Sequence, residues 1–280
     1  MIKNLLLCTD GSDYSNVAAD YAIWLAQQWQ ARLAALHVTD VRLLEGPLLA
    51  DISGAIGAQP FRAFLPQLQE IYKQKAETIL GAVKDRCAKA GVAVETLHKT
   101  GGLVDSILEE ERRAELVVIG QRGEHAPFIG EMLGSSVERL VRRSVKPCLV
   151  TPDQFREVRR IVAAYDGSKE SSKSLTTAFD VTRWLKASLS VITVCGVGDE
   201  ARGAQTLKEA VTLAESHGLK PTNRLLQGDA DAEILKFADE QKVDLIVMGA
   251  YGQTRIREWI LGSVTTSVIR RSTVAVLLTR

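Results

Sequence analysis

The sequence is poor in cysteine and histidine, and neither residue type is spaced as in a metal site. Its 280 residues contain four cysteines and four histidines, scattered along the chain. No Cys-x-x-Cys pair and no pair of histidines at ligand spacing occurs. Cys8, Cys148 and Cys195 lie in apolar runs, so we expect reduced, buried thiols there. A metal bound by the protein alone is not expected.

Long apolar runs and an excess of charge of one sign are also missing. No stretch reaches the roughly 18 apolar residues of a membrane-spanning helix, and the short run that ends at Asp10 is not a signal peptide. The formal net charge is only +1, which argues against a nucleic-acid or membrane surface. We expect the basic pairs 142–143 and 270–271 to be solvated or to face anions. These absences predict a cytoplasmic protein that binds neither nucleic acid nor a membrane.

Two common phosphate-binding motifs are absent as well. There is no Gly-x-x-x-x-Gly-Lys-Ser/Thr loop, and no Gly-x-Gly-x-x-Gly follows the first apolar run. The sequence is therefore unlike that of a P-loop NTPase or an NAD-dependent dehydrogenase.

The chain does contain an internal duplication. Three segments of its first half return in the same order in its second half: Asn4–Ser12 as Arg160–Ser168, Glu115–Gly123 as Asp244–Gly252, and Gly134–Ser135 as Gly262–Ser263. Such a repeat indicates two copies of one domain. We call them copy one, residues 1–152, and copy two, residues 153–280. The join between them is short, so we expect the copies to pack together.

Each copy alternates short apolar runs with amphipathic stretches. Runs of Val, Ile and Leu indicate strands buried on both faces, and strand–helix alternation indicates a parallel sheet. In copy one we predict strands at 2–8, 33–38, 92–97, 115–119 and 147–151, and helices at 13–30, 66–90, 102–112 and 134–143. In copy two we predict strands at 159–165, 188–194, 220–226, 243–248 and 274–279, and helices at 169–186, 202–217, 230–241 and 262–271. The fold class is α/β, with two tandem open-sheet domains, each a five-stranded parallel sheet with helices on both faces.

The copies differ after their second strand. Copy one has a surplus at residues 40–69 that is rich in Leu, Gly, Pro and Ala. We interpret it as a surface loop that carries a short helix. A mobile flap over the first site, a partner-binding surface and a cover for a small apolar ligand are the alternatives.

Candidate binding residues lie where the predicted strands end. Ligands of open parallel sheets bind outside the carboxyl ends of the strands, where the strand order reverses. In copy two Asp166 closes the first strand, and a glycine-rich loop that starts at Gly249 follows the fourth. Glycines let phosphate approach the backbone, and a helix that opens at Gly262 and Ser263 offers free N–H groups to an anion.

Side chains around this loop complete a predicted adenine nucleotide site. Ser263 and Thr265 supply hydroxyl groups and Arg255 supplies a positive charge for the phosphates, while Asp166 suits the ribose hydroxyls. Asp166 or Ser263 also suits a Mg²⁺ ion that arrives with the nucleotide. The plainer interpretation is that the glycines only turn the chain and that Asp166 only caps a helix. The whole constellation, on matching strand ends of a repeated domain, favours nucleotide binding.

With these residues the chain resembles the universal stress protein family of the tandem-domain type. The family's ATP-binding pattern, Gly-x2-Gly-x9-Gly-Ser/Thr, is matched by Gly249, Gly252, Gly262 and Ser263. The likeness covers essentially the whole chain, once per copy.

The resemblance implies a Rossmann-like fold of the adenine nucleotide alpha hydrolase type. It places adenine against the end of the second strand, at Val38 and Val194, and the phosphates on the glycine loop and the adjoining Val264. It implies ATP, ADP or AMP as ligand and pairing of the domains through their last strands, which a tandem chain can satisfy internally. A homodimer and an unidentified protein partner are further expectations.

Copy one departs from the pattern. The corresponding candidate residues are Asp10, Val38, Gly120, Gly123, Gly134, Ser135 and Ser136. Ten residues rather than nine separate Gly123 from Gly134. Glu124 repels phosphate and Pro127 stiffens the loop, so nucleotide binding by copy one stays open.

The sequence thus predicts an ATP-binding stress-response regulator with at most slow ATP hydrolysis. Phosphoryl transfer needs a group that orients water or accepts a proton, and usually a metal. The copy-two loop contains no histidine, and we assign no catalytic residue. The alternatives are a slow ATPase or nucleotidyl-transfer enzyme, and a nucleotide-independent scaffold with vestigial pockets.

Overall fold

The computed structural model describes residues 2–40, 61–124, 135–250 and 262–280, with the backbone alone for 61–65 and 135. Copy one contains β1 (Asn4–Cys8), α1 (Asp13–Trp29), β2 (Arg32–Asp40), α4 (Phe61–Lys89), β3 (Val94–Gly101), α5 (Leu103–Glu110), the 3₁₀ turn η1 (Glu111–Arg113), β4 (Leu116–Gly120), α7 (Ser135–Arg143) and β5 (Cys148–Thr151). Copy two contains β6 (Arg160–Ala164), α8 (Lys169–Leu185), β7 (Ser188–Cys195), α9 (Glu200–Ser216), β8 (Thr222–Gln227), α10 (Ala230–Glu240), β9 (Leu245–Gly249), α11 (Ser263–Arg271) and β10 (Ala275–Thr279).

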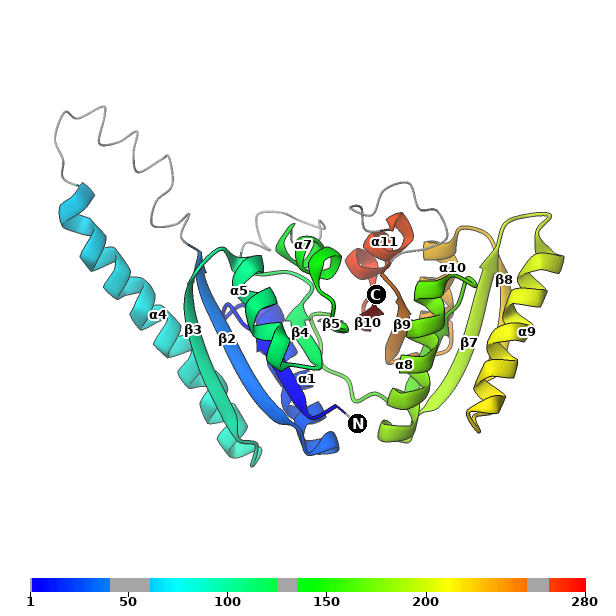
Figure 1. Cartoon of the computed structure of the whole chain (residues 1–280), viewed down its shortest axis with the longest axis horizontal. Coiled ribbons are helices and arrows are strands. Elements are labelled where there is room, and N and C mark those ends of the chain that lie inside the picture. Colours follow the sequence, from blue (N-terminus) through cyan, green and yellow to red (C-terminus); the bar gives the residue numbers. More distant parts are fainter. Residues whose placement is uncertain (1, 41–60, 125–134, 251–261) are drawn as a thin grey trace.

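The strands form one ten-stranded sheet rather than two separate ones (Figure 1). Their order is β3-β2-β1-β4-β5-β10-β9-β6-β7-β8. Within each copy every pairing is parallel, as predicted. The single antiparallel pairing joins β5 to β10, where Val150 faces Val276. The expected pairing of the two last strands is therefore present, and it occurs within the chain.

The sheet is buried on both faces because its strands are apolar on both sides. Along β1, Leu5 and Leu7 enter one core and Leu6 and Cys8 enter the other. The first core is covered by α1, α4, α8 and α9, and the second by α5, α7, α10 and α11. Each core contains residues of both copies, so the two halves share their hydrophobic stabilisation.

Helix ends follow the predicted signals. Ser12 and Ser168 accept a hydrogen bond from the backbone N–H three residues on, at 3.2 and 3.1 Å, and so cap α1 and α8. Gly91 and Gly218 follow α4 and α9 with positive φ angles of 68° and 74°, a conformation that glycine adopts without strain.

One helix boundary was predicted wrongly. The long copy-one helix was predicted to start at residue 66, but α4 already begins at Phe61 and contains Pro66. The end of the surplus segment 40–69 is thus helical, whereas residues 41–60, where the flap, partner surface and ligand cover were placed, lie outside the described residues.

The cysteines are free and buried, as predicted. Burial raises the pKa of the Cys148 thiol to about 12, and it raises that of Cys8 further above its usual value. Thiols with such pKa values carry almost no reactive thiolate at neutral pH.

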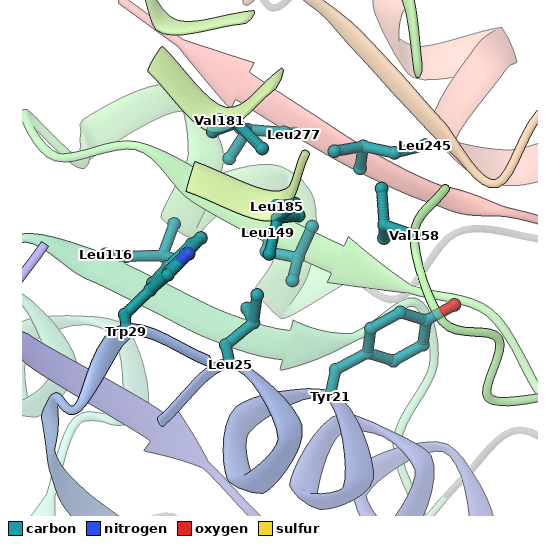
Figure 2. A pocket seen from close by; sticks show the side chains of 10 residues that line it. All are labelled: Tyr21, Leu25, Trp29, Leu116, Leu149, Val158, Val181, Leu185, Leu245 and Leu277. Carbon is teal, nitrogen blue, oxygen red and sulfur yellow. The ribbon is translucent and has the colours of Figure 1, made fainter. Parts of the chain in front are cut away.

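A small apolar cavity lies between the copies, where α1 and α8 pack on one face of the central strands. It has a volume of about 20 Å³ and is lined by side chains of both copies: Tyr21, Leu25, Trp29, Leu116, Leu149, Val158, Val181, Leu185, Leu245 and Leu277 (Figure 2). Beside it, the rings of Trp29 and Trp184 meet edge to face at 5.7 Å, and Phe155 of the linker packs on Tyr21 at 4.9 Å. The linker thus contacts α1 through the Phe155 ring, although residues 153–157 are exposed.

We expect Val181→Ile to stabilise the protein, since one added methylene fills space that already lies between the copies. The gain is limited to about 1 kcal/mol, or roughly a 2 °C rise in Tm for a chain of this size. Thermal unfolding followed by circular dichroism measures it. Val191→Ile is the matched control, because Val191 is fully buried but does not line the cavity; overpacking there costs about 1–3 kcal/mol. Equal effects of the two changes would contradict the expectation.

Candidate functional site

The predicted site residues gather at the carboxyl ends of the strands. In each copy the order reverses beside the first strand, between β1 and β4 and between β6 and β9. Asp10 and Asp166 follow β1 and β6, while Gly120 and Gly249 end β4 and β9. These are the positions at which open parallel sheets bind ligands.

In copy one the Asp10 carboxylate is held by the chain itself. Its Oδ1 accepts from the Ser12 N–H at 3.0 Å and from the Ser12 hydroxyl at 2.6 Å. Its Oδ2 accepts from the Glu124 N–H at 2.8 Å. A Cβ atom at Gly123 would lie 2.6 Å from this Oδ2, so only glycine lets the loop come this close.

The copy-one loop is also tied to the long helix α4. The Lys75 ammonium lies 2.5 Å from the Glu124 carboxylate, and both side chains are exposed. We expected Glu124 to repel phosphate, but its charge faces α4 and is partly balanced there. The loop is therefore fastened at two neighbouring points, the Glu124 side chain and its backbone N–H.

Other copy-one candidates are only partly described. Gly134 lies outside the described residues, and of Ser135 the structure gives the backbone, which starts α7. Ser136 is half-buried and accepts from Arg139 at 3.4 Å. A Cβ at Gly120 would lie 2.9 Å from the backbone of Tyr14, so this glycine allows close packing of α1 on β4.

Copy two brings both ends of its glycine loop together. The N–H of Gly262 points at the carbonyl of Ala250, 3.5 Å away, and Thr265 donates its hydroxyl to the Gly249 carbonyl at 3.1 Å. Thr265 is buried, so its hydroxyl ties α11 to the end of β9. Ser263, in contrast, is exposed at the first turn of α11.

The remaining copy-two candidates frame this loop. Asp166 accepts from the Ser168 N–H at 2.9 Å, whereas the side chain that caps α8 is that of Ser168. Val194 and Val264 are half-buried against the second core, as is Val38 in copy one. Gly252 and Arg255 lie outside the described residues.

One arginine of each basic pair contacts a carboxylate. Arg143 lies 2.7 Å from Asp105, and Arg271 lies 3.2 Å from Asp231. Asp231 also accepts from the Ser267 hydroxyl. This bond, together with the charge of Arg271 and backbone donors of α10, lowers the pKa of Asp231 below its ordinary value. The contacts tie α10 to α11.

Two histidines beside the copy-one site were not predicted to meet. His37 and His98 face each other across β2 and β3, with ring centroids 5.9 Å apart. His37 Nδ1 contacts the Thr9 carbonyl at 2.9 Å, and His98 Nε2 contacts the Thr39 hydroxyl at 2.9 Å. Burial and the nearby His37 lower the pKa of His98. Only the register of two strands that are distant in sequence reveals this pair.

A cavity of about 550 Å³ lies elsewhere, at the amino ends of β1, β2 and β3. Leu6, Ala34 and Leu97 line it together with Glu110 and Arg113. It is at the opposite end of the strands from Asp10 and is not the predicted nucleotide site.

Two further observations concern metal ligands and membrane-spanning helices within the described residues. No group of three His, Cys, Asp or Glu side chains is placed there to hold a metal ion. In the same part of the chain no helix has the length and apolar character needed to cross a bilayer.

We expect the Asp231 contacts to stabilise the fold at neutral pH and to be lost in acid. Since the folded pKa is depressed, the contribution is complete above the ordinary aspartate pKa near 3.8 and disappears as the pH falls through the lower folded value. Asp231→Asn should therefore lower stability at pH 7 by less than about 1 kcal/mol, as for a largely exposed pair, and by less still near pH 3. Urea unfolding at both pH values, with Asp239→Asn as an exposed control, measures this. A loss that grows towards pH 3 would contradict it.

Comparison with known proteins agrees with this arrangement. A sequence model of the Universal stress protein family matches residues 1–152 and again residues 157–280. A universal stress protein of Synechocystis sp. is 34% identical over 99% of both chains, and one of Bacillus subtilis is 30% identical over 54% of this chain and 99% of its own. The crystal structure of a universal stress protein from Archaeoglobus fulgidus has a TM-score of 0.78 at 24% identity and covers 99% of this chain and 98% of its own. The chain therefore belongs to the universal stress protein family, with two family repeats joined in tandem.

Proposed function

We propose that copy two binds an adenine nucleotide, namely ATP, and that the protein acts as a nucleotide-responsive stress regulator. The observation that carries the proposal is the closure of the copy-two loop, whose ends at Gly249 and Gly262 are held together by Thr265. This leaves the first turn of α11 and the exposed Ser263 at the sheet edge beside Asp166. An anion there meets free N–H groups and the positive end of the helix dipole.

The glycine pattern supports the same ligand. Gly249, Gly252, Gly262 and Ser263 keep the spacing of the family's ATP-binding motif, and the chain belongs to that family. In this proposal Val194 contacts the adenine, Asp166 the ribose, and Arg255 the phosphates. Mg²⁺ enters with the nucleotide, beside Ser263 or Asp166.

Copy one is proposed to bind nucleotide more weakly than copy two. Both carboxylate oxygens of Asp10 already accept hydrogen bonds from the chain, so a ribose has to compete with the Glu124 N–H. Opening this loop also breaks the ion pair between Lys75 and Glu124. We therefore expect binding near one nucleotide per chain.

Rapid catalysis is not part of the proposal. The described residues around Asp166 place no histidine beside it, and the histidine pair that they do contain, His37 and His98, lies in copy one. Slow hydrolysis is the enzymatic alternative, and a nucleotide-independent scaffold is the other. An enzyme that hydrolyses ATP slowly should show ATP turnover at saturating Mg²⁺. A nucleotide-independent scaffold should show no affinity for any adenine nucleotide.

Gly262→Asp is expected to abolish ATP binding, because a carboxylate at the start of α11 occupies the phosphate position and opposes its charge. Isothermal titration of the purified chain with ATP and Mg²⁺ measures the affinity, after an aliquot is denatured to quantify co-purified nucleotide. We expect a loss of at least about 100-fold, as for an unpaired like charge of roughly 3 kcal/mol.

The matched control is Gly134→Asp, the same change at the equivalent position of copy one. It should leave the copy-two affinity within a few-fold of the wild-type value. A wild-type protein that neither binds ATP nor contains co-purified nucleotide would refute the proposal, as would an unchanged affinity in Gly262→Asp.

Asp10→Asn tests the proposed closure of copy one. An amide at this position accepts the Glu124 N–H more weakly than a carboxylate does, so the loop should open more easily. We expect faster backbone hydrogen exchange at residues 121–124, by about fivefold. Asp166→Asn, which is the equivalent change in copy two, should leave these amides unchanged. Equal exchange in all three proteins would show that Asp10 does not hold the loop.

A further inference from the structure

The last turn of α11 is held by a side chain of copy one. Gln121 directly follows β4 and is 5% exposed. Its Nε2 donates to the carbonyl of Ile269 and, at 3.4 Å, to that of Ser272. Carbonyls at a helix C-terminus lack partners within the helix, and here the other copy supplies one.

Gln121 is itself firmly placed. Its backbone N–H donates to the carbonyl of Thr151 at 2.9 Å, which continues the pairing of β4 with β5. A buried amide in such a position loses little additional freedom when it bonds to Ile269, and solvent does not compete for the bond. The contact therefore acts as a brace between the two copies.

The two copies are not equivalent at this point. The residue of copy two that corresponds to Gln121 is Ala250, which is equally buried but has no side-chain donor. At the end of α7 the nearest counterpart is an exposed contact, from the Arg280 guanidinium to the Arg142 carbonyl at 3.4 Å. Among the described residues, a buried amide from the other copy braces α11 but not α7.

The braced helix carries the proposed phosphate site at its other end. α11 has nine residues and is therefore about 13 Å long. Val268 and Ile269 are completely buried in the second core, and Thr265 ties the first turn to β9. A short helix packed in this way moves as a unit, so a tilt at its end displaces its start.

We propose that Gln121 is a positioning residue for the copy-two nucleotide site and couples that site to the loop of copy one. Gln121 lies between Gly120 and Gly123, and Gly123 packs on the Asp10 carboxylate. A change at Asp10 alters the loop that follows Gln121 and so shifts the side-chain amide of Gln121. Because this amide holds the end of α11, the start of α11 shifts as well. The inference rests on the proposed function, because it concerns the regulation of the same site.

The first test does not require a nucleotide. Gln121→Ala gives copy one the residue that copy two has, so the fold should tolerate it. In the free protein we expect the amides of α11 to exchange hydrogen about fivefold faster than in wild type, as for one lost hydrogen bond. The amides of α8 should not change, and Arg280→Ala, which removes the exposed contact, should leave α11 unaffected.

The second test is the ATP affinity of the full chain, measured by calorimetry for the site that Gly262→Asp removes. Gln121→Ala should weaken it about fivefold, near the lower limit of typical coupling between sites. Asp10→Asn should change the copy-two affinity in the wild-type background and have no effect in the Gln121→Ala background. A merely structural role of Gln121 predicts equal effects of Asp10→Asn in both backgrounds.

The outcomes separate the inference from the proposed function. Unchanged α11 exchange together with unchanged affinity in Gln121→Ala would overturn the positioning role. An effect of Asp10→Asn that persists in the Gln121→Ala background would overturn the coupling. Faster α11 exchange in a protein that binds no ATP would refute the proposed function and the coupling, and would leave Gln121 as a brace between the copies.

Discussion

Three residue pairs along β5 and β10 join the two halves of the sheet, and most other contacts between the copies follow from them. Without this pairing each five-stranded half has an unpaired strand edge beside its last helix, and exposed edges of this kind recruit other chains. With this pairing, the hydrophobic core on each face of the sheet runs through both copies. The pairing also brings Gln121, which follows β4, within reach of Ile269 in α11; Figure 1 shows β4, β5, β10 and α11 near the middle of the sheet.

Most of the fold could be predicted from the sequence because its signals are local. Apolar runs set the strands, Ser12 and Ser168 set two helix starts, and Gly91 and Gly218 set two helix ends. The duplication then allowed each interpretation to be checked twice. The resemblance to the family supplied the pairing of the last strands, which no local signal contains.

The contacts that the sequence did not reveal are all long-range. Glu124 was read as a charge near phosphate, but its partner Lys75 comes from a helix 49 residues away. Gln121 follows Gly120 in the copy-one glycine loop, and its side chain bonds to a residue 148 positions further on, Ile269 of α11. Neither Lys75 nor Ile269 can be identified as a partner until the β1–β4 and β5–β10 pairings fix the positions of α4 and α11. The pair His37 and His98 likewise depends on the register of β2 and β3, which are distant in sequence.

The covalent link between the copies has an evolutionary consequence. In a symmetric homodimer one gene encodes both partners, so every substitution appears on both sides of the twofold axis. Here positions 121 and 250 are encoded by separate codons, so each can be substituted without the other, and they differ as glutamine and alanine. The same freedom allows copy one to form the ion pair between Lys75 and Glu124, while copy two keeps the family's glycine spacing. Fusion thus allows the two sides of the interface to differ, so that a side chain of one copy can hold a helix of the other without a reciprocal contact.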